Sequence, residues 1–177
     1  QRRGVGEVAG EIEGAGGRIN AYTSFDVTCY HATLPASQAR LGLDVLADAT
    51  TQSIFDPDEI GREIEVVLEE IRRGEDSPHS VLGDALFAEA YRSHPYGAPI
   101  LGPSESVASF DRAKVRAFFE RWYTPEHLSV VAVGDFDPDA MREQARNSFG
   151  SLAPGTARRK RPSAPPPKGL RTKDRKS

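Results

Sequence analysis

The order of strand-like and helix-like segments constrains the fold of this chain more than any other feature. Two runs rich in Tyr, Thr, Val and Ile, residues 19–24 and 27–34, are separated only by Phe25-Asp26, which is typical of a β-hairpin. Amphipathic helical patterns precede and follow this pair. Because strands and helices alternate only loosely, we predict an α+β fold in which a mixed or antiparallel sheet is covered by helices.

Capping residues indicate where the helices begin and end. A first helix with apolar residues at Val5, Val8 and Ile12 should end at the glycine-rich residues 14–17. Five further helices are expected to begin at Pro35, Pro57, Pro78, just after Asp111, and at Pro138. Residues 128–133 form a continuous apolar run of strand length, so we predict a buried strand there.

Composition limits the chemistry. The chain of 177 residues contains one cysteine, Cys29, which excludes an internal disulfide and any cysteine-cluster zinc site, so a metal would need histidine or carboxylate ligands. No apolar run approaches the roughly 18 residues of a transmembrane helix, and we expect no membrane span. From Gln1 onward no signal peptide is recognisable, which leaves a cytoplasmic and a periplasmic location open for a bacterial protein.

Charge is distributed unevenly along the chain. Residues 1–154 carry 14 basic and 25 acidic side chains, a net charge of −11, whereas residues 155–177 carry nine basic side chains and one acidic one, a net charge of +8. An acidic body disfavours a phosphate backbone, and the basic tail has no interleaved aromatic residues, so we expect no nucleic-acid partner. We predict that residues 151–177 are a Pro-rich basic linker.

The helix expected from Pro57 carries the most prominent candidates for chemistry. Glu63 and Glu70 are seven residues apart and lie within about 20° of each other on one helix face. Such a pair could supply a metal ligand and a supporting carboxylate. A solvated acidic face is the alternative, because glutamate favours helices and Glu69 could pair with Arg73.

The remaining residue types give no catalytic pattern. The four histidines, His31, His79, His94 and His127, form no i,i+4 pair on a helix, and neither H-E-x-x-H nor H-x-x-E-H occurs. No G-x-S-x-G motif is present, and the glycine-rich residues 14–17 precede a strand rather than a helix. We therefore find no convincing nucleophile or general base.

Four separated motifs occur in a fixed order along the chain. They are I-E-G-A-G-G-R-I-N-A-Y-T-S at 12–24, F-D-P at 55–57 leading to Glu63 and V-L-E-E-I at 67–71, H-P-Y-G at 94–97 with P-I-L-G at 99–102, and W-Y-T-P-E at 122–126 with G-D at 134–135. From about Gly4 to Gly150 the chain resembles the pitrilysin/insulinase family of zinc metallopeptidases. This is the inverzincin group that includes mitochondrial processing peptidase.

The resemblance implies roles for particular residues. The family holds one zinc ion with the two histidines of an H-x-x-E-H helix, whose glutamate is the general base, and with a glutamate on a later helix that matches Glu70. Glu63 matches a supporting carboxylate of that later helix. Asn20, Ala21 and Tyr22 match an edge strand on which the family binds its peptide substrate as an additional strand.

The chain departs from the family pattern at both ends. The H-x-x-E-H segment would lie upstream of Gly4, and the sequence given starts at Gln1, so neither the ligand pair nor the general base is among these residues. We therefore expect residues 1–150 to form a partial metallopeptidase-like domain that is inactive alone. Residues 151–177 are expected to lead to a second domain of similar fold, in the same polypeptide or in a partner subunit.

Two functions follow from the resemblance. The first is a zinc-dependent metalloendopeptidase that cleaves peptides or unfolded polypeptide with a zinc-activated water. The alternative is a non-catalytic partner subunit that binds polypeptide through the strand containing Asn20. The presence of both Glu63 and Glu70 favours the peptidase.

Overall fold

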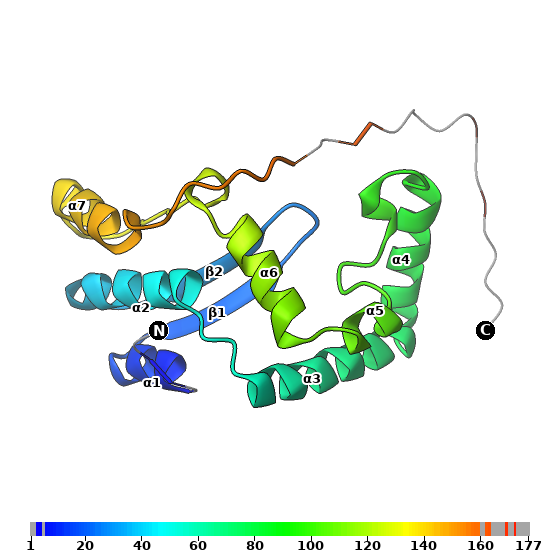
Figure 1. Ribbon diagram of the computed structural model, residues 1–177, viewed down its shortest axis with the longest axis horizontal. Helices are drawn as coiled ribbons and strands as arrows, with labels where there is room; N and C mark the ends of the chain where they lie inside the picture. Colours follow the sequence, from blue (N-terminus) through cyan, green and yellow to red (C-terminus); the bar gives the residue numbers. More distant parts are fainter. Residues whose placement is uncertain (1–2, 5, 160–161, 164–168, 170–171, 173–177) are drawn as a thin grey trace. The chain divides into compact units, whose positions relative to one another are not determined.

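The computed structural model describes residues 3–4, 6–159, 162–163, 169 and 172 (Figure 1). The chain separates into two compact units, one made of residues 1–55 and 115–157 and the other of residues 56–114 and 158–177. The described residues form seven α-helices and one two-stranded antiparallel sheet. The predicted α+β class is confirmed, with a sheet that is small relative to the helices.

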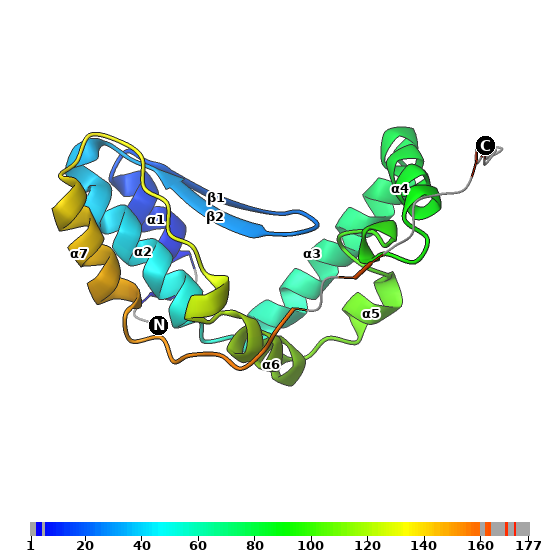
Figure 2. The ribbon, with the colours of Figure 1, turned by 90° about the horizontal axis from the view of Figure 1, so that it is seen from above.

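The first unit is built on the predicted hairpin. Strand β1 (Arg18–Thr23) pairs antiparallel with strand β2 (Thr28–Thr33), and the register places Ala21 opposite Tyr30. Helices α1 (Glu7–Gly14), α2 (Ala39–Thr51) and α7 (Pro138–Phe149) lie side by side in Figures 1 and 2. In this layer α1 packs against β1 and α2 against β2, while α7 packs against α2.

Helix α2 is the central element of the first unit. Its residues Leu43, Val45 and Ala47 are buried, as is Ile12 on α1. The helix begins later than predicted, because a 3₁₀ turn, η1 (Ala36–Gln38), follows Pro35. These buried apolar side chains are few for a unit of this size, so polar contacts also hold its helices together.

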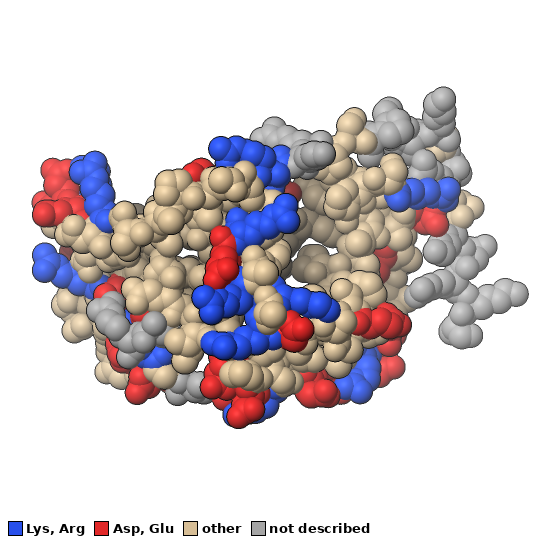
Figure 3. Space-filling model, in the orientation of Figure 1, with Lys and Arg blue, Asp and Glu red and all other residues tan. Residues whose placement is uncertain are grey.

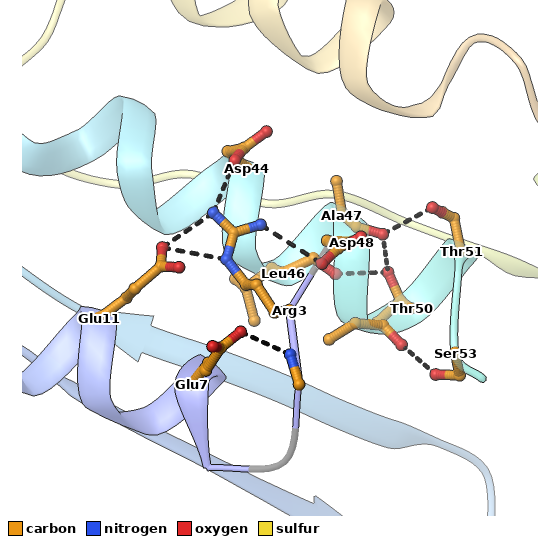
Figure 4. A network of polar contacts seen from close by, with 12 residues as sticks. Arg3, Glu7, Glu11, Asp44, Leu46, Ala47, Asp48, Thr50, Thr51 and Ser53 are labelled. Carbon is orange, nitrogen blue, oxygen red and sulfur yellow. Dashed lines mark hydrogen bonds and ion pairs between the residues drawn. The ribbon is translucent and has the colours of Figure 1, made fainter. Parts of the chain in front are cut away.

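An ion cluster centred on the buried Arg3 side chain joins this residue to α1 and α2 (Figure 4). The Arg3 guanidinium donates to Glu11 at 2.9 and 3.0 Å, to Asp44 at 2.8 Å and to Asp48 at 3.4 Å. The Arg3 side chain is 9% exposed and that of Asp48 is fully buried. Hydrogen bonding to Glu11 raises the pKa of Arg3, opposed by desolvation, so the guanidinium stays charged.

An aromatic series connects β2 to the end of α6 (Arg112–Trp122) within the same unit. The hydroxyl groups of Tyr30 and Tyr123 lie 2.5 Å apart, and Tyr123 stacks on Phe119, which meets Phe55 edge to face. Burial, followed by the hydrogen bond with Tyr30, raises the pKa of Tyr123. The neutral phenol is therefore the form that the folded state stabilises.

The second unit contains the predicted acidic helix. Helix α3 (Pro57–Glu75) begins at Asp56, whose carboxylate accepts from the amides of Asp58 and Glu59 at 2.9 and 3.2 Å, with Pro57 at the first position. Helices α4 (Pro78–Ala90) and α5 (Ser104–Ala108) pack against α3, and Val107 of α5 is buried. The start predicted at Pro57 is thus confirmed.

The prediction of a buried strand at residues 128–133 is wrong for this chain. The structure assigns no strand there, and Val131 and Val133 are 83% and 93% exposed. The physical reason is that the only strands among the described residues, β1 and β2, pair with each other. An apolar run becomes a buried strand only where a neighbouring strand pairs with it.

Two further predictions concern membrane-spanning helices and the linker. Among the described residues, no helix has the length and apolar character needed to cross a membrane. The predicted linker, residues 151–177, lies partly outside the described residues and stays a prediction.

Replacing Arg3 should destabilise the first unit strongly. The substitution Arg3→Met breaks the ion pair between Arg3 and the buried Asp48 carboxylate, and breaking a buried pair typically costs about 3–5 kcal/mol of unfolding free energy. Urea unfolding followed by circular dichroism measures this loss. The matched control is Arg142→Met, which removes an exposed ion pair to Asp139 on α7 and should change the free energy by less than about 1 kcal/mol. Equal effects of the two variants would contradict the structural role of the cluster.

Candidate functional site

The peptide-binding residues suggested by the sequence lie on β1, whose outer edge pairs with no other strand among the described residues. Ser24 donates its amide to the Val27 carbonyl at 2.8 Å, which makes this the hydrogen-bonded pair at the turn. Because hydrogen-bonded and non-hydrogen-bonded pairs alternate along an antiparallel ladder, the main-chain groups of Tyr22 and Asn20 point toward β2. The main-chain groups of the alternate residues, Ile19, Ala21 and Thr23, point away from β2.

The Ala21 amide confirms this alternation. It donates to the Oδ1 atom of Asn20 at 2.8 Å, and both residues are exposed. The Asn20 side chain therefore accepts the hydrogen bond of the outward-facing Ala21 amide. Covering an edge amide in this way is one means by which a protein limits unwanted strand pairing.

The side chains of β1 alternate between two faces of the hairpin. Asn20 and Tyr22 share one face with Cys29 and His31 of β2, and the Tyr22 ring lies 6.2 Å from the His31 ring. The Cys29 thiol raises the pKa of the exposed Tyr22 hydroxyl by hydrogen bonding and charge. Ala21 lies on the opposite face with Tyr30, so the three predicted residues share a strand edge but not a face.

The two candidate carboxylates lie on α3 in the second unit. Glu63 and Glu70 are both exposed, and at about 100° per residue they lie at the side of the packed face of the helix. That packed face consists of half-buried apolar residues at helical spacing, namely Ile60, Ile64, Val67, Leu68 and Ile71. The predicted common face of Glu63 and Glu70 is therefore consistent with the way the helix packs.

Other charged groups on α3 are paired with one another. Glu59 pairs with Arg62 at 2.9 Å, and Glu69 pairs with Arg72 at 3.1 Å, one residue earlier than the Arg73 partner that the sequence suggested. Figure 3 shows carboxylates and guanidinium groups interspersed over this helix. Among the residues described, no ion pair or side-chain hydrogen bond engages Glu63 or Glu70.

The described residues do not form a complete metal site. No three histidine, cysteine, aspartate or glutamate side chains within them are arranged to hold a metal ion. Two histidines have structural partners: His94 accepts from the Tyr96 amide at 3.2 Å, and the His127 ring contacts the Thr124 hydroxyl at 3.1 Å. The described residues therefore offer exposed carboxylates on α3 but no complete set of metal ligands.

Sequence reasoning missed the two polar features that shape the first unit. Arg3 was not identified, although Asp44 and Asp48 are two acids at i,i+4 on an otherwise apolar helix face, a pattern that indicates a buried cation. The contact between Asn20 and the Ala21 amide was also missed. It depends on the side-chain rotamer of Asn20, for which the sequence contains no signal.

Solved structures share this fold. A protease from Helicobacter pylori superposes with a TM-score of 0.81 at 27% identity, over 92% of this chain and 40% of that one. The first half of the periplasmic protease PqqL from Escherichia coli superposes with a TM-score of 0.78 at 22% identity, over 89% of this chain.

Two curated relatives have a higher sequence identity to this chain than these two solved structures. A protein named as a zinc protease in Mycobacterium leprae is 38% identical over 162 residues, which are 92% of this chain and 36% of the relative. The β subunit of the mitochondrial-processing peptidase of Blastocladiella emersonii is 34% identical over 150 residues, 85% of this chain and 32% of that subunit. The chain thus spans about a third of the length of these relatives.

Two family descriptions match the chain in succession. "Peptidase M16 inactive domain" matches residues 109–177. "Insulinase (Peptidase family M16)" matches residues 1–104, more than half of the chain. The chain therefore belongs to the insulinase family of peptidases, M16, as its motifs predict.

Proposed function

We propose that this chain is part of a zinc metalloendopeptidase and supplies one zinc ligand, Glu70, to it. The observation that carries the proposal is the pair of exposed carboxylates, Glu63 and Glu70, on one face of α3 in a chain of the M16 family. Relatives named as zinc proteases support the same chemistry. The substrate class is a peptide or an unfolded polypeptide.

Each carboxylate has a distinct part in this proposal. Glu70 would hold the metal through its carboxylate, and Glu63, one heptad earlier, would orient the site by hydrogen bonding. When bound, zinc supplies a polarised substrate carbonyl and an activated water. The histidine ligands and the general base are contributed from outside these 177 residues, so the chain alone is inactive.

The edge of β1 supplies the proposed peptide contact. The outward main-chain groups of Ile19, Ala21 and Thr23 suit an extended peptide that pairs as an additional strand. A peptide that bonds to Ala21 displaces the Asn20 side chain from its amide. The freed carboxamide, with one acceptor and two donors, is then available to the peptide. This recognition reads the main chain of the peptide and not its side chains.

The second candidate is a non-catalytic subunit that binds polypeptide. It is favoured by the match of residues 109–177 to the inactive domain of the family. The similarity to a mitochondrial-processing peptidase β subunit favours a protein that works with a partner of similar fold. In this function the edge of β1 would bind polypeptide in the same way, and Glu70 would hold no metal.

Replacing Glu70 separates the two functions. In the full-length parent polypeptide, Glu70→Gln removes one of three protein ligands, so zinc affinity should fall by more than about 100-fold and hydrolysis should fall with it. Glu63→Gln should lower zinc affinity by about 10–100-fold, the range for supporting groups. Chelator competition and peptide hydrolysis measure the two effects.

A matched control is available on the same helix. Glu65→Gln changes another exposed carboxylate of α3 that is not on the face of Glu63 and Glu70, and it should leave zinc affinity unchanged. Unchanged zinc content and hydrolysis in Glu70→Gln would contradict the peptidase proposal. Peptide binding that is retained in a parent without zinc would support the non-catalytic subunit.

Removing the Ala21 amide should weaken peptide binding without breaking the hairpin. Ala21→Pro deletes a donor that points away from β2, so the ladder keeps its hydrogen bonds while the added strand loses one. Affinity for an unstructured peptide should fall about fivefold to tenfold, measured by fluorescence anisotropy. The control Ala21→Val retains the amide and should bind as the wild type does. Equal affinity of Ala21→Pro and Ala21→Val would contradict docking at this edge.

The Asn20 side chain should slow amide exchange at Ala21. In Asn20→Ala the Ala21 amide loses its acceptor, and its hydrogen-exchange rate should rise about fivefold, the effect of one hydrogen bond of about 1 kcal/mol. Exchange followed by NMR measures this rate. Thr28→Ala, which removes a hydroxyl contact to Thr23 on the same hairpin, serves as the control and should leave Ala21 unaffected. An unchanged rate in Asn20→Ala would show that Asn20 does not cover the edge.

A further inference from the structure

The residues that follow α7 fold back onto the W-Y-T-P-E motif at 122–126, which the proposed function does not use. Residues 152–157, here called the strap, run from the end of α7 toward the end of α6 without helix or strand (Figure 2). The Gly155 amide donates to Oε2 of Glu126 at 2.9 Å, across 29 residues of sequence. Glu126 lies in the 3₁₀ turn η3 (Pro125–His127), and both residues belong to the first unit. The strap is therefore docked on this turn.

Gly155 also packs against Thr124 so closely that only glycine fits. A Cβ atom on residue 155 would lie 2.6 Å from Oγ1 and 2.7 Å from Cγ2 of Thr124, closer than real Cβ contacts. Thr124 is 5% exposed, and its hydroxyl contacts Nδ1 of His127 at 3.1 Å. A buried β-branched side chain whose hydroxyl is engaged has little freedom to move aside. The docking of the strap thus depends on the absence of a side chain at residue 155.

The residue before Thr124 contacts the hairpin. The Tyr123 hydroxyl lies 2.5 Å from that of Tyr30 on β2, and Tyr30 lies opposite Ala21 in the register. Because the main-chain groups of Ala21 point away from β2, this opposed pair shares no ladder hydrogen bond, and side-chain contacts help to hold it. The strap and the hairpin therefore meet the chain at two successive residues, Thr124 and Tyr123.

We propose that the docked strap positions the β1 edge for peptide binding. With Gly155 held on Thr124 and Glu126, the turn keeps Tyr123 against Tyr30, opposite Ala21. Release of the strap frees the turn and loosens the hairpin at the edge that binds the peptide. The inference rests on the proposed function in which the β1 edge is the peptide contact. It makes Gly155 a positioning residue, and a movement of the polypeptide that follows the strap reaches the edge by this route.

Hydrogen exchange with mass spectrometry on the full-length parent tests the coupling. Gly155→Ala forces a Cβ atom against Thr124, so exchange of residues 152–157 and of β2, residues 28–33, should rise about fivefold, the effect of losing one hydrogen bond. Residues 57–75 of α3, in the second unit, should exchange as in the wild type. Glu126→Gln retains the shape of the side chain and weakens the acceptor, so it should raise exchange in the same two segments by a smaller factor. This milder variant decides the question if Gly155→Ala does not fold.

Two further variants serve as controls. Gly10→Ala adds a methyl group on α1 where no atom lies within 4 Å, and it should leave the exchange of β2 unchanged. Thr124→Ala removes the Oγ1 and Cγ2 atoms that the new Cβ atom would meet. The double variant Gly155→Ala, Thr124→Ala should therefore raise exchange by less than the product of the two single effects.

Peptide affinity gives the functional readout. The affinity of the parent for an unstructured peptide should fall about fivefold in Gly155→Ala and stay unchanged in Gly10→Ala. The turnover number of the parent should not change, because the strap does not contact Glu63 or Glu70 among the described residues. A rise in KM without a fall in kcat distinguishes positioning of the edge from damage to the proposed metal site.

Three outcomes would overturn the proposal. They are a rise in exchange confined to residues 152–157, a uniform rise through the whole first unit, which would make Gly155 a residue of general stability, and equal peptide affinity of Gly155→Ala and the wild type. A wild-type parent that binds no peptide, but in which Gly155→Ala still raises exchange in β2 alone beyond the strap, would contradict the proposed function. That result would leave the coupling of the strap to the hairpin supported.

Discussion

Main-chain hydrogen bonding is the constraint on which the rest of this structure depends. Within the described part of the chain, the two strands satisfy their backbone groups between them and both outer edges of the sheet stay open. On β1 the open edge includes the Ala21 amide, which Asn20 covers with its own side chain. At residues 128–133 nothing among the described residues pairs with the backbone, and strongly apolar side chains stay in solvent. The proposed peptide contact is therefore a consequence of this open backbone.

The hairpin is held in place by helices that depend on one buried cation. Arg3 neutralises Asp48 in the interior of the first unit and joins α1 to α2, the two helices that pack against β1 and β2. Such a cluster contributes less net stability than apolar packing of equal volume, but it is sensitive to the loss of one partner. It also specifies how α1 and α2 meet, since a guanidinium that bonds three carboxylates fits one arrangement. The orientation of the β1 edge is coupled to this cluster through α1.

Local sequence signals predicted most of the elements, because the caps and turns that define them are local. Asp56 with Pro57 fixes the start of α3, and Phe25-Asp26 marks the hairpin. The common face of Glu63 and Glu70 follows from helical periodicity alone. The prediction of a strand at residues 128–133 was wrong because a strand needs a pairing strand from elsewhere in the sequence. The contacts of Arg3 were not predicted because its partners are 8, 41 and 45 residues away in the sequence. The zinc-binding and peptide-binding roles were inferred from the family resemblance that four motifs carry in their order. No single residue spacing predicts these roles.

We propose that the outer edge of β1 binds peptide independently of metal. An NMR titration of the 177-residue chain with an unstructured peptide, with and without zinc, tests it most directly. We expect chemical-shift changes concentrated at the amides of Ile19, Ala21 and Thr23, with the same affinity in the presence of a chelator. Shift changes confined to other elements, or binding that requires zinc, would contradict it.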